Sequence, residues 1–345
     1  ECIYVGYDST NFNTNAYGIE LADYGHPKVD EGLPQYNLAY AVNQKDSTPL
    51  FYELYDGSVI DNTELEIMLE EAKEFGHEKL GVLMDRGYIS EKNIKALRTK
   101  GYEYILMMKQ NQRICQEIIE EYGAAVQSLE GYYIGEHGVY GTTVKKQLYG
   151  QETNIHVYYD DIRASEEKVA LMSRYETWEK EIEKKVAKRI ATEGEMKKYR
   201  KVFKLKYDQN GYLVAYQRNS RYIKEEIRNL GFFFIMTSED MSASKALDIY
   251  RGRDNIEKMF RSLKSGIDFN KARVHTTESL KSKVFVTFIA MIVRNELFQK
   301  AEELRKKNRK AYTVPGMISE LENIECTRNS VGKYRRKYAL TAKQK

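Results

Sequence analysis

One stretch of the sequence, residues 250–264, carries four side chains that could act together on a polyanion. They are a phenol, two cations and a carboxylate: Tyr250, Arg253, Lys264 and Glu257. On an α-helix, at about 100° per residue, they fall within an arc of roughly 60° and form one polar stripe. A carboxylate suits a divalent metal ion, which prefers oxygen ligands, and Arg and Lys suit phosphate oxygens. The stretch is therefore a candidate active-site helix.

An apolar stripe runs beside the polar one and would hold the helix against a core. Its members are Ile256, Met259, Phe260 and Leu263, and they have the i, i+3, i+4, i+7 spacing of a buried helix face. Two features favour a plainer interpretation. Charged residues on an amphipathic helix commonly form its solvated face, and Gly252 can break the helix before Arg253.

The four polar residues also resemble a family signature. Their pattern is Tyr250, two residues, Arg253, three residues, Glu257, six residues and Lys264. It resembles the Tyr-Arg-Glu-Lys signature of one branch of the DDE transposases of bacterial insertion sequences. The resemblance implies a ribonuclease H-like catalytic domain and two further aspartates, each at the end of a β-strand.

Two aspartates lie where the resemblance requires them. Asp8 follows the apolar run 2–7, and Asp85 follows the run 80–84, whose uninterrupted apolar character is typical of a central strand. The carboxyl ends of such strands are where α/β sheets place their ligands. Each aspartate can equally be a turn residue that caps a strand end. Asp56 competes with Asp85, but Asp56-Gly57 is typical of a plain turn.

The elements around the aspartates alternate between strand and helix. Apolar periodicity predicts strands at 2–7, 36–42, 50–55, 80–84, 104–108 and 231–237. Helices are expected at 62–75 and 90–100, the second beginning at Ser90. The predicted fold class is α/β, with a ribonuclease H-like mixed sheet flanked by helices. A β-rich and helical insertion interrupts it.

The insertion is more polar than its surroundings. Strands are expected at 142–148, 154–159, 202–207 and 212–216, and a long helix at 165–190. Asn210-Gly211 predicts a hairpin turn between the last two strands. Transposases of the matching branch carry a β-rich insertion here, and the resemblance implies that this segment is its counterpart. Trp178 could stack on a flipped base, or pack within its own domain.

These elements define four parts of the chain. We expect residues 1–110 to form the first part of the catalytic domain, 111–230 the insertion, and 231–300 the second part of the catalytic domain with the glutamate helix. Residues 301–345 are expected to be a basic helical tail. The apolar run 284–293 is broken by Thr287 and is too short for a membrane span, which needs about 20 residues. We therefore interpret it as a buried helix.

Composition excludes several classes of protein. The chain has 345 residues, 42% hydrophobic, which favours a folded protein over a disordered one. Its three cysteines are widely spaced and its five histidines lack metal-ligand spacing, which argues against a disulfide framework and against a zinc site of Cys or His. No phosphate-binding glycine motif supports ATP or NAD chemistry. Arg273 and His275 stay without an assigned role.

Positive charge is concentrated rather than abundant. The formal net charge is +4, with 55 basic and 51 acidic residues. Basic residues gather between Lys184 and Lys206 and in the tail, at Lys333, Arg335, Arg336, Lys337, Lys343 and Lys345. Such clusters are candidate phosphate-binding patches; a solvated helix surface is the alternative.

The resemblance implies a complete reaction. Asp8, Asp85 and Glu257 would ligate Mg²⁺, or Mn²⁺ in its place, for DNA strand cleavage at the element's ends and strand transfer into target DNA. Tyr250, Arg253 and Lys264 would bind DNA phosphates. A homodimer on DNA and a nucleoid-associated location in the bacterial cytoplasm, away from membranes, are also implied. Two alternatives stay open: a metal-dependent nuclease without strand transfer, and an inactive DNA-binding derivative.

The first residues of the chain lead to one more expectation. The sequence begins Glu-Cys-Ile-Tyr rather than with Met, and it enters an expected core strand at once. Relatives place an end-recognition domain before that strand. We therefore expect the sequence to be truncated at its front.

Overall fold

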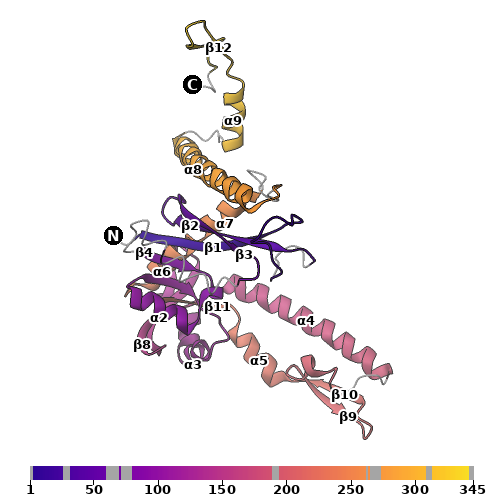
Figure 1. Cartoon of the computed structure of the whole chain (residues 1–345). Helices are drawn as coiled ribbons and strands as arrows, with labels where there is room; N and C mark the ends of the chain where they lie inside the picture. Colours follow the sequence, from indigo (N-terminus) through magenta and orange to yellow (C-terminus); the bar gives the residue numbers. More distant parts are fainter. Residues whose placement is uncertain are drawn as a thin grey trace. The chain divides into compact units, whose positions relative to one another are not determined.

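The computed structural model divides the chain into two compact units, each described by itself (Figure 1). The first comprises Glu1–Tyr102 and Arg251–Lys345, and the second comprises Glu103–Tyr250. The residues that the structure describes are 3–25, 32–59, 70, 80–188, 194–261, 263–264, 273–307 and 313–341. Apart from Glu70, the helix expected at 62–75 lies outside them.

A mixed sheet forms the centre of the first unit. Its strands are β1 (Ile3–Asn13), β2 (Gln35–Asn43), β3 (Pro49–Asp56) and β4 (Leu80–Met84). Their order is β3-β2-β1-β4, with β1, β2 and β3 antiparallel and β4 parallel to β1. Every residue of β4 is buried, which agrees with its uninterrupted apolar sequence.

The first strand is longer than its sequence pattern predicted. A strand was expected at residues 2–7, followed by a turn at Asp8, but β1 continues through the polar run to Asn13. The reason is its partner, because Asp8 to Asn13 pair with Tyr40 to Gln35 of β2. These strand hydrogen bonds satisfy the backbone N–H and C=O groups of a segment that its local sequence predicts to be a turn. Ser9, Thr10 and Asn11 are consequently buried.

The glutamate segment is not one continuous helix, so that prediction was wrong, whereas the break expected at Gly252 is present. Helix α6 (Ala243–Arg251) ends before Gly252, and α7 (Asp254–Arg261) begins after Arg253. Ser242 therefore caps α6, its hydroxyl accepting from the Lys245 N–H, and not the helix that carries Glu257. The break falls at the glycine, which lacks the side chain that stabilises a helix interior.

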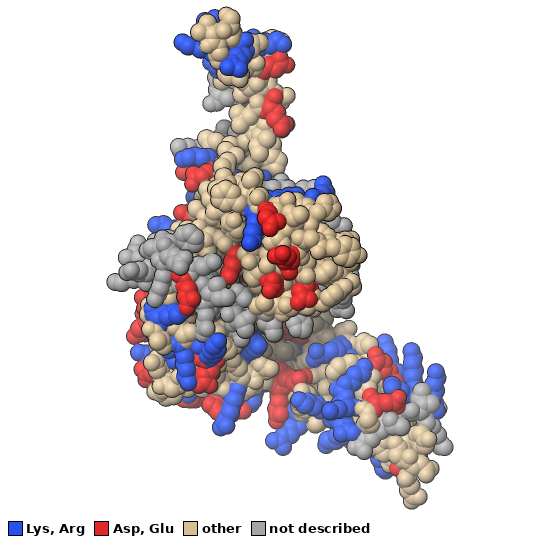
Figure 2. Space-filling model, in the orientation of Figure 1, with Lys and Arg blue, Asp and Glu red and all other residues tan. Residues whose placement is uncertain are grey.

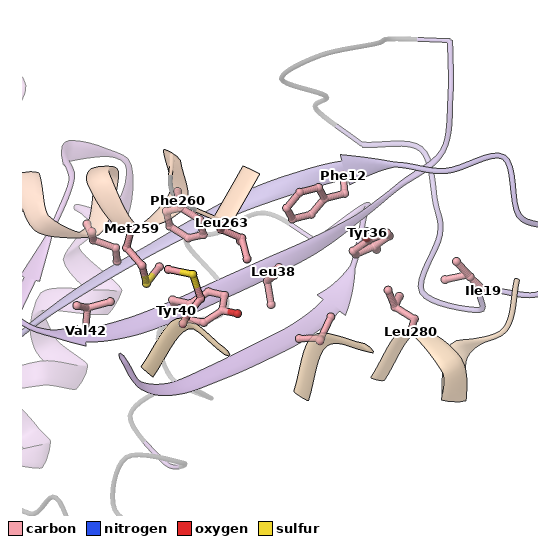
Figure 3. Packing of buried hydrophobic residues seen from close by; sticks show 13 residues of the cluster. Phe12, Ile19, Tyr36, Leu38, Tyr40, Val42, Met259, Phe260, Leu263 and Leu280 are labelled. Carbon is pink, nitrogen blue, oxygen red and sulfur yellow. The ribbon is translucent and has the colours of Figure 1, made fainter. Parts of the chain in front are cut away.

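The apolar stripe of the glutamate segment is buried as predicted. Ile256, Met259, Phe260 and Leu263 have between 0% and 8% of their surface exposed. Figure 3 shows the last three over the sheet, close to Leu38 and Tyr40 of β2. Phe260 meets the Tyr40 ring edge-on at 5.8 Å between centroids. This contact anchors α7 on the sheet.

Further helical segments belong to the described part of the first unit. They are η1 (Arg86–Tyr88), α2 (Glu91–Lys100), α8 (Thr277–Lys307) and α9 (Val314–Glu322). Of these, α8 contacts β3 and α9 contacts α8. The Ser90 hydroxyl accepts from the Asn93 N–H at the start of α2, as predicted, and Gly101 ends that helix at φ 73°. None of the described helices has the length and apolar character needed to cross a membrane.

Two expectations for the C-terminal third need correction. The run 284–293 lies in α8 but only part of it is buried, since Phe285, Val286 and Ile289 are exposed. An apolar run covers all sides of a helix, whereas only one stripe can face the sheet. The tail is not helical throughout, because β12 (Cys326–Arg328) and β13 (Tyr334–Arg336) follow α9. They form a hairpin.

Five neighbouring strands belong to the second unit. They are β5 (Glu103–Met107), β6 (Tyr133–Ile134), β7 (Val139–Leu148), β8 (Gln151–Tyr159) and β11 (Phe232–Thr237). They lie in the order β5-β11-β8-β7-β6, and all pairs are antiparallel. Besides α6, its helices are α3 (Arg113–Ser128), η2 (Glu130–Tyr132), α4 (Asp161–Lys188), η3 (Lys197–Tyr199) and α5 (Ser220–Asn229).

A separate apolar cluster lies among α4, α5 and the hairpin of β9 (Phe203–Tyr207) and β10 (Leu213–Arg218). The predicted Asn210-Gly211 turn is present, with Gly211 at φ 78°. Trp178 is half-buried here and meets the Tyr199 ring edge-on at 5.7 Å between centroids. Its indole therefore packs within the cluster, in agreement with the packing alternative.

Candidate active site

The alternation of β1 places a row of side chains under α7. Side chains two residues apart on a strand share a face, so Gly6, Asp8, Thr10 and Phe12 project the same way. A Cβ at Gly6 would stand 3.8 Å from the Ile256 Cβ, an ordinary contact that shows how closely α7 approaches this face. Asp8 thus lies on the face that α7 covers.

The parallel pairing of β1 with β4 sets the position of Asp85. Gly6 pairs with Leu83, and the same register continued by two residues places Asp85 level with Asp8. Asp85 also caps η1, because its Oδ1 accepts from the Arg86 N–H at 2.7 Å. Asp8 behaves alike, since its Oδ1 accepts from the Ser9 N–H at 2.9 Å. Each aspartate therefore keeps its Oδ2 for another partner.

That partner is the guanidinium of Arg253. Its Nη2 lies 3.4 Å from Asp8 Oδ2 and 3.8 Å from Asp85 Oδ2, and its Nη1 lies 3.5 Å from Glu257 Oε1. Three carboxylates that are far apart in the sequence therefore converge on one cation. Arg253 stands one residue before α7, and Glu257 lies one helical turn further along, which explains their contact.

The site is graded from a buried centre to an open rim. The Arg253 side chain is 15% exposed and that of Asp8 21%, whereas Asp85 and Glu257 are 40% and 52% exposed. Water screens the outer ion pairs more strongly than the inner one. The Glu257 carboxylate is therefore the one most accessible to a molecule that approaches from solvent.

Lys264 lies further along the same face of β1. Its Nζ donates to Thr10 Oγ1 at 2.8 Å and lies 5.3 Å from the centroid of the Phe12 ring. Thr10 and Phe12 were not predicted as site residues. Their signal is the strand period, since they lie two and four residues beyond Asp8.

Two further candidates from the sequence lie on other elements than β1, β4 and α7. Tyr250 lies on α6 in the second unit, where it is buried with 7% of its surface exposed. Asp56 ends β3, and its backbone carbonyl accepts from the Asn37 side chain at 2.8 Å. Asp56-Gly57 forms a turn, as predicted.

The donor types of this site suit a hard divalent cation, although the carboxylates are arranged around Arg253 and not around a metal position. Three carboxylates surround one positive group and offer only oxygen ligands, which Mg²⁺ and Mn²⁺ prefer. Within the described part of the chain, no group of three or more His, Cys, Asp and Glu side chains is arranged to hold a metal ion. At Asp8, Asp85 and Glu257, the guanidinium stands at the centre of the carboxylates and supplies the positive charge.

A cavity of about 420 Å³ lies between α7 and α8. It is lined by residues of α7, α8, the start of α9 and the β2–β3 turn, among them Met259, Met291, Phe298 and Val314. None of the three carboxylates lines it. The carboxylate cluster, not this cavity, therefore carries the candidate chemistry.

Comparisons with known proteins complete this description. None of the curated proteins matches the chain. Among solved structures, a piggyBac transposase in a synaptic complex with hairpin DNA is similar at a TM-score of 0.41 and 8% identity, over 90% of this chain and 50% of that one. This chain thus spans about half the length of that transposase. The family model described as "Transposase DDE domain" matches residues 6–293, a range that contains Asp8, Asp85 and Glu257, and the chain belongs to this family.

Proposed function

We propose that the chain is a transposase of a bacterial insertion sequence, of the branch with the Tyr-Arg-Glu-Lys signature. It cuts DNA strands at the ends of the element and joins them to target DNA. The observation that carries this proposal is the convergence of Asp8, Asp85 and Glu257 on Arg253. The strand order β3-β2-β1-β4, with β4 parallel to β1, supports a ribonuclease H-like catalytic domain.

In this proposal Asp8, Asp85 and Glu257 would hold divalent metal ions. Bound there, such ions supply charge neutralisation at the phosphate and a lowered pKa for the attacking oxygen. Asp8 and Asp85 have one oxygen each fixed by a backbone N–H, which orients the other toward the cluster. This preorganisation limits the rearrangement needed for catalysis.

The cations would position the DNA. Arg253 and Lys264 lie on the same side of β1 as Asp8. Their positive charges could there bind the DNA phosphates beside the cleaved bond. Such contacts fix the strand but do not identify its sequence. Tyr250 is proposed as a third phosphate contact by family resemblance. The same resemblance supports a homodimer on DNA and a nucleoid-associated location in the cytoplasm.

The test is a cleavage and strand-transfer assay with Mg²⁺ or Mn²⁺. The substrates are duplexes from the DNA that flanks the gene, both intact and with a pre-formed 3′-hydroxyl end. The parent chain should cut the first and join the second to a target plasmid. Asp85→Asn and Glu257→Gln should both lose these activities, because each removes a metal ligand. Asp56→Asn, a loss of one carboxylate outside the cluster, should keep them.

Each failure has a distinct meaning. Metal-dependent cleavage without joined product would replace this proposal by a nuclease that does not transfer strands. Binding of DNA with no cleavage by the parent chain would leave the inactive DNA-binding derivative. Equal losses in Asp56→Asn and Asp85→Asn would show that the cluster is not the active site.

A further inference from the structure

The β12–β13 hairpin at residues 325–338 has no role in the chemistry described above. All six of its strand residues are exposed. Its turn is well defined: Asn329 Oδ1 accepts from the N–H groups of Val331 and Lys333, and Gly332 has φ 83°. An isolated two-stranded hairpin is marginally stable in water. Both of its strands are therefore open to a partner.

The charge of the hairpin selects the kind of partner. The hairpin has five cationic side chains and a single carboxylate, that of Glu325, which pairs with Lys337 at 2.8 Å. The cations are Arg328, Lys333, Arg335, Arg336 and Lys337. The net charge of +4 equals the formal net charge of the whole chain. Figure 2 shows these basic side chains gathered at the end of the chain where Figure 1 labels β12.

The cations lie on both faces of the hairpin. Residues that pair directly across two strands share a face, so the pairing of Arg328 with Tyr334 and of Cys326 with Arg336 puts two arginines on one face. Arg335, which pairs with Thr327, lies on the other. A hairpin that docked on a protein core would need one apolar face. Here the two faces share the same positive character.

Aromatic rings accompany these cations. The Arg328 guanidinium lies 5.8 Å from the centroid of the Tyr334 ring, and Lys337 Nζ lies 5.4 Å from that of Tyr338. Both tyrosines are exposed, at 70% and 65%. The rings restrict the side chains that they contact, which lowers the entropy lost when those side chains bind a partner.

We propose that this hairpin is a DNA-binding ribbon that inserts into a groove of duplex DNA and contacts phosphates on both walls. A two-stranded ribbon fits the major groove, about 12 Å wide, and cations on both faces match the two phosphate backbones that border it. The ribbon supplies affinity and not chemistry. The choice of DNA among polyanions rests on the proposed transposase function.

The test measures how the full chain binds a short duplex of arbitrary sequence, by fluorescence anisotropy in metal-free buffer between about 50 and about 200 mM salt. Arg335→Ala/Arg336→Ala removes one cation from each face. It should reduce the slope of log K against log salt by about two, one for each lost phosphate contact. Arg335→Lys/Arg336→Lys keeps both charges and should keep the slope.

A matched control removes the same charge elsewhere in the first unit. Lys300→Ala/Lys306→Ala affects two exposed residues of α8 and should leave the slope unchanged. Equal effects of the two Ala pairs, or no effect of the hairpin pair, would overturn the inference. So would a hairpin pair that loses affinity for anionic lipid vesicles but not for duplex DNA.

The assay separates this inference from the proposed function. Cleavage with an unchanged slope in the hairpin variant would reject the ribbon and retain the transposase. A reduced slope in a chain that never cleaves would retain the ribbon and reject the transposase. Circular dichroism of each variant checks that the fold is kept, which exposed positions should allow.

Discussion

Arg253 offsets one of the three negative charges of the carboxylates at the candidate active site. Its guanidinium contacts Asp8, Asp85 and Glu257 at 3.4, 3.8 and 3.5 Å. A planar guanidinium with several donors can reach three acceptors at once, which a lysine ammonium does less well. Bound metal ions would bring positive charge to the same carboxylates. Arg253 and a metal would therefore each offset part of the same negative charge.

This relation predicts how Arg253→Gln responds to metal. Without metal, the variant leaves three carboxylates close together and should lose about 1.5–3 kcal/mol of stability, the usual range for hydrogen bonds to a charged group. Mg²⁺ should raise its melting temperature more than that of the parent chain, because the ion replaces the missing charge. Calorimetry with and without Mg²⁺ measures both effects. Equal Mg²⁺ shifts in the two proteins would contradict the prediction, and Arg253→Lys is the charge-retaining control.

At the scale of elements, the break between α6 and α7 positions the site. Gly252 occupies this break, and a Cβ there would stand 2.1 Å from Gln44 Nε2 and 2.6 Å from Gln44 Cγ. Its φ is not among the positive values of the chain. The need for glycine is therefore steric, and it arises from the β2–β3 turn.

Gly252→Ala should consequently destabilise the first unit by about 0.5–1.5 kcal/mol, the usual cost of forcing a side chain such as Gln44 out of its preferred rotamer. In a Gln44→Ala background the same substitution should cost much less, because the clashing side chain is absent. Urea unfolding of the two single variants and the double variant gives the coupling energy. Additive effects would show that the steric explanation is incorrect.

One strand of the second unit carries a buried titratable side chain. His156 on β8 is fully buried, and its ring nitrogens contact the hydroxyls of Thr143 and Thr237 at 2.8 and 3.0 Å. Burial lowers the pKa of His156 from 6.5 to about 4. The folded state therefore favours the neutral ring.

Acid should destabilise this unit in a defined window. Below pH 6.5 the unfolded chain protonates His156 while the folded chain resists, so stability falls until the pH reaches about 4. The loss is roughly 3 kcal/mol in total. His156→Gln should be less stable at neutral pH but should lose less stability across this window. Urea unfolding at several pH values tests this, and an equally steep loss in the variant would contradict it.

At the scale of the molecule, two compact units have cores of their own. Leu38 lies in the core of the first unit, under α7 and α8, and Phe203 lies in a cluster of the second unit. Both side chains are completely buried. A destabilising substitution in one core should therefore promote the unfolding of that unit before the other.

Leu38→Ala should cost about 2–5 kcal/mol and Phe203→Ala about 3–5 kcal/mol. Each should make its own unit the first to unfold, since the lost contacts lie within one unit. Limited proteolysis with mass spectrometry would locate the early cleavages within Glu1–Tyr102 and Arg251–Lys345 for the first variant. For the second they should lie within Glu103–Tyr250. The same cleavage pattern in both variants would show one cooperative molecule instead.

The sequence by itself determined the parts that depend on local patterns. The apolar run 80–84 became β4 with the predicted bounds, Ser90 caps α2, and the apolar stripe of the glutamate segment is buried. Each follows from periodicity or from a cap within a few residues. The residue types and spacing around Glu257 likewise indicated the family that residues 6–293 match.

Only the tertiary structure decided how these parts meet. Asp8 lies inside β1 because pairing with β2 extends that strand. The register between β1 and β4, continued by two residues, places Asp8 opposite Asp85. The role of Arg253 as the common partner of three carboxylates depends on the β1–β2 pairing, on the β1–β4 register and on the break at Gly252. Pairing between strands, and packing of a helix on them, depend on residues distant in the chain, which local propensity does not contain.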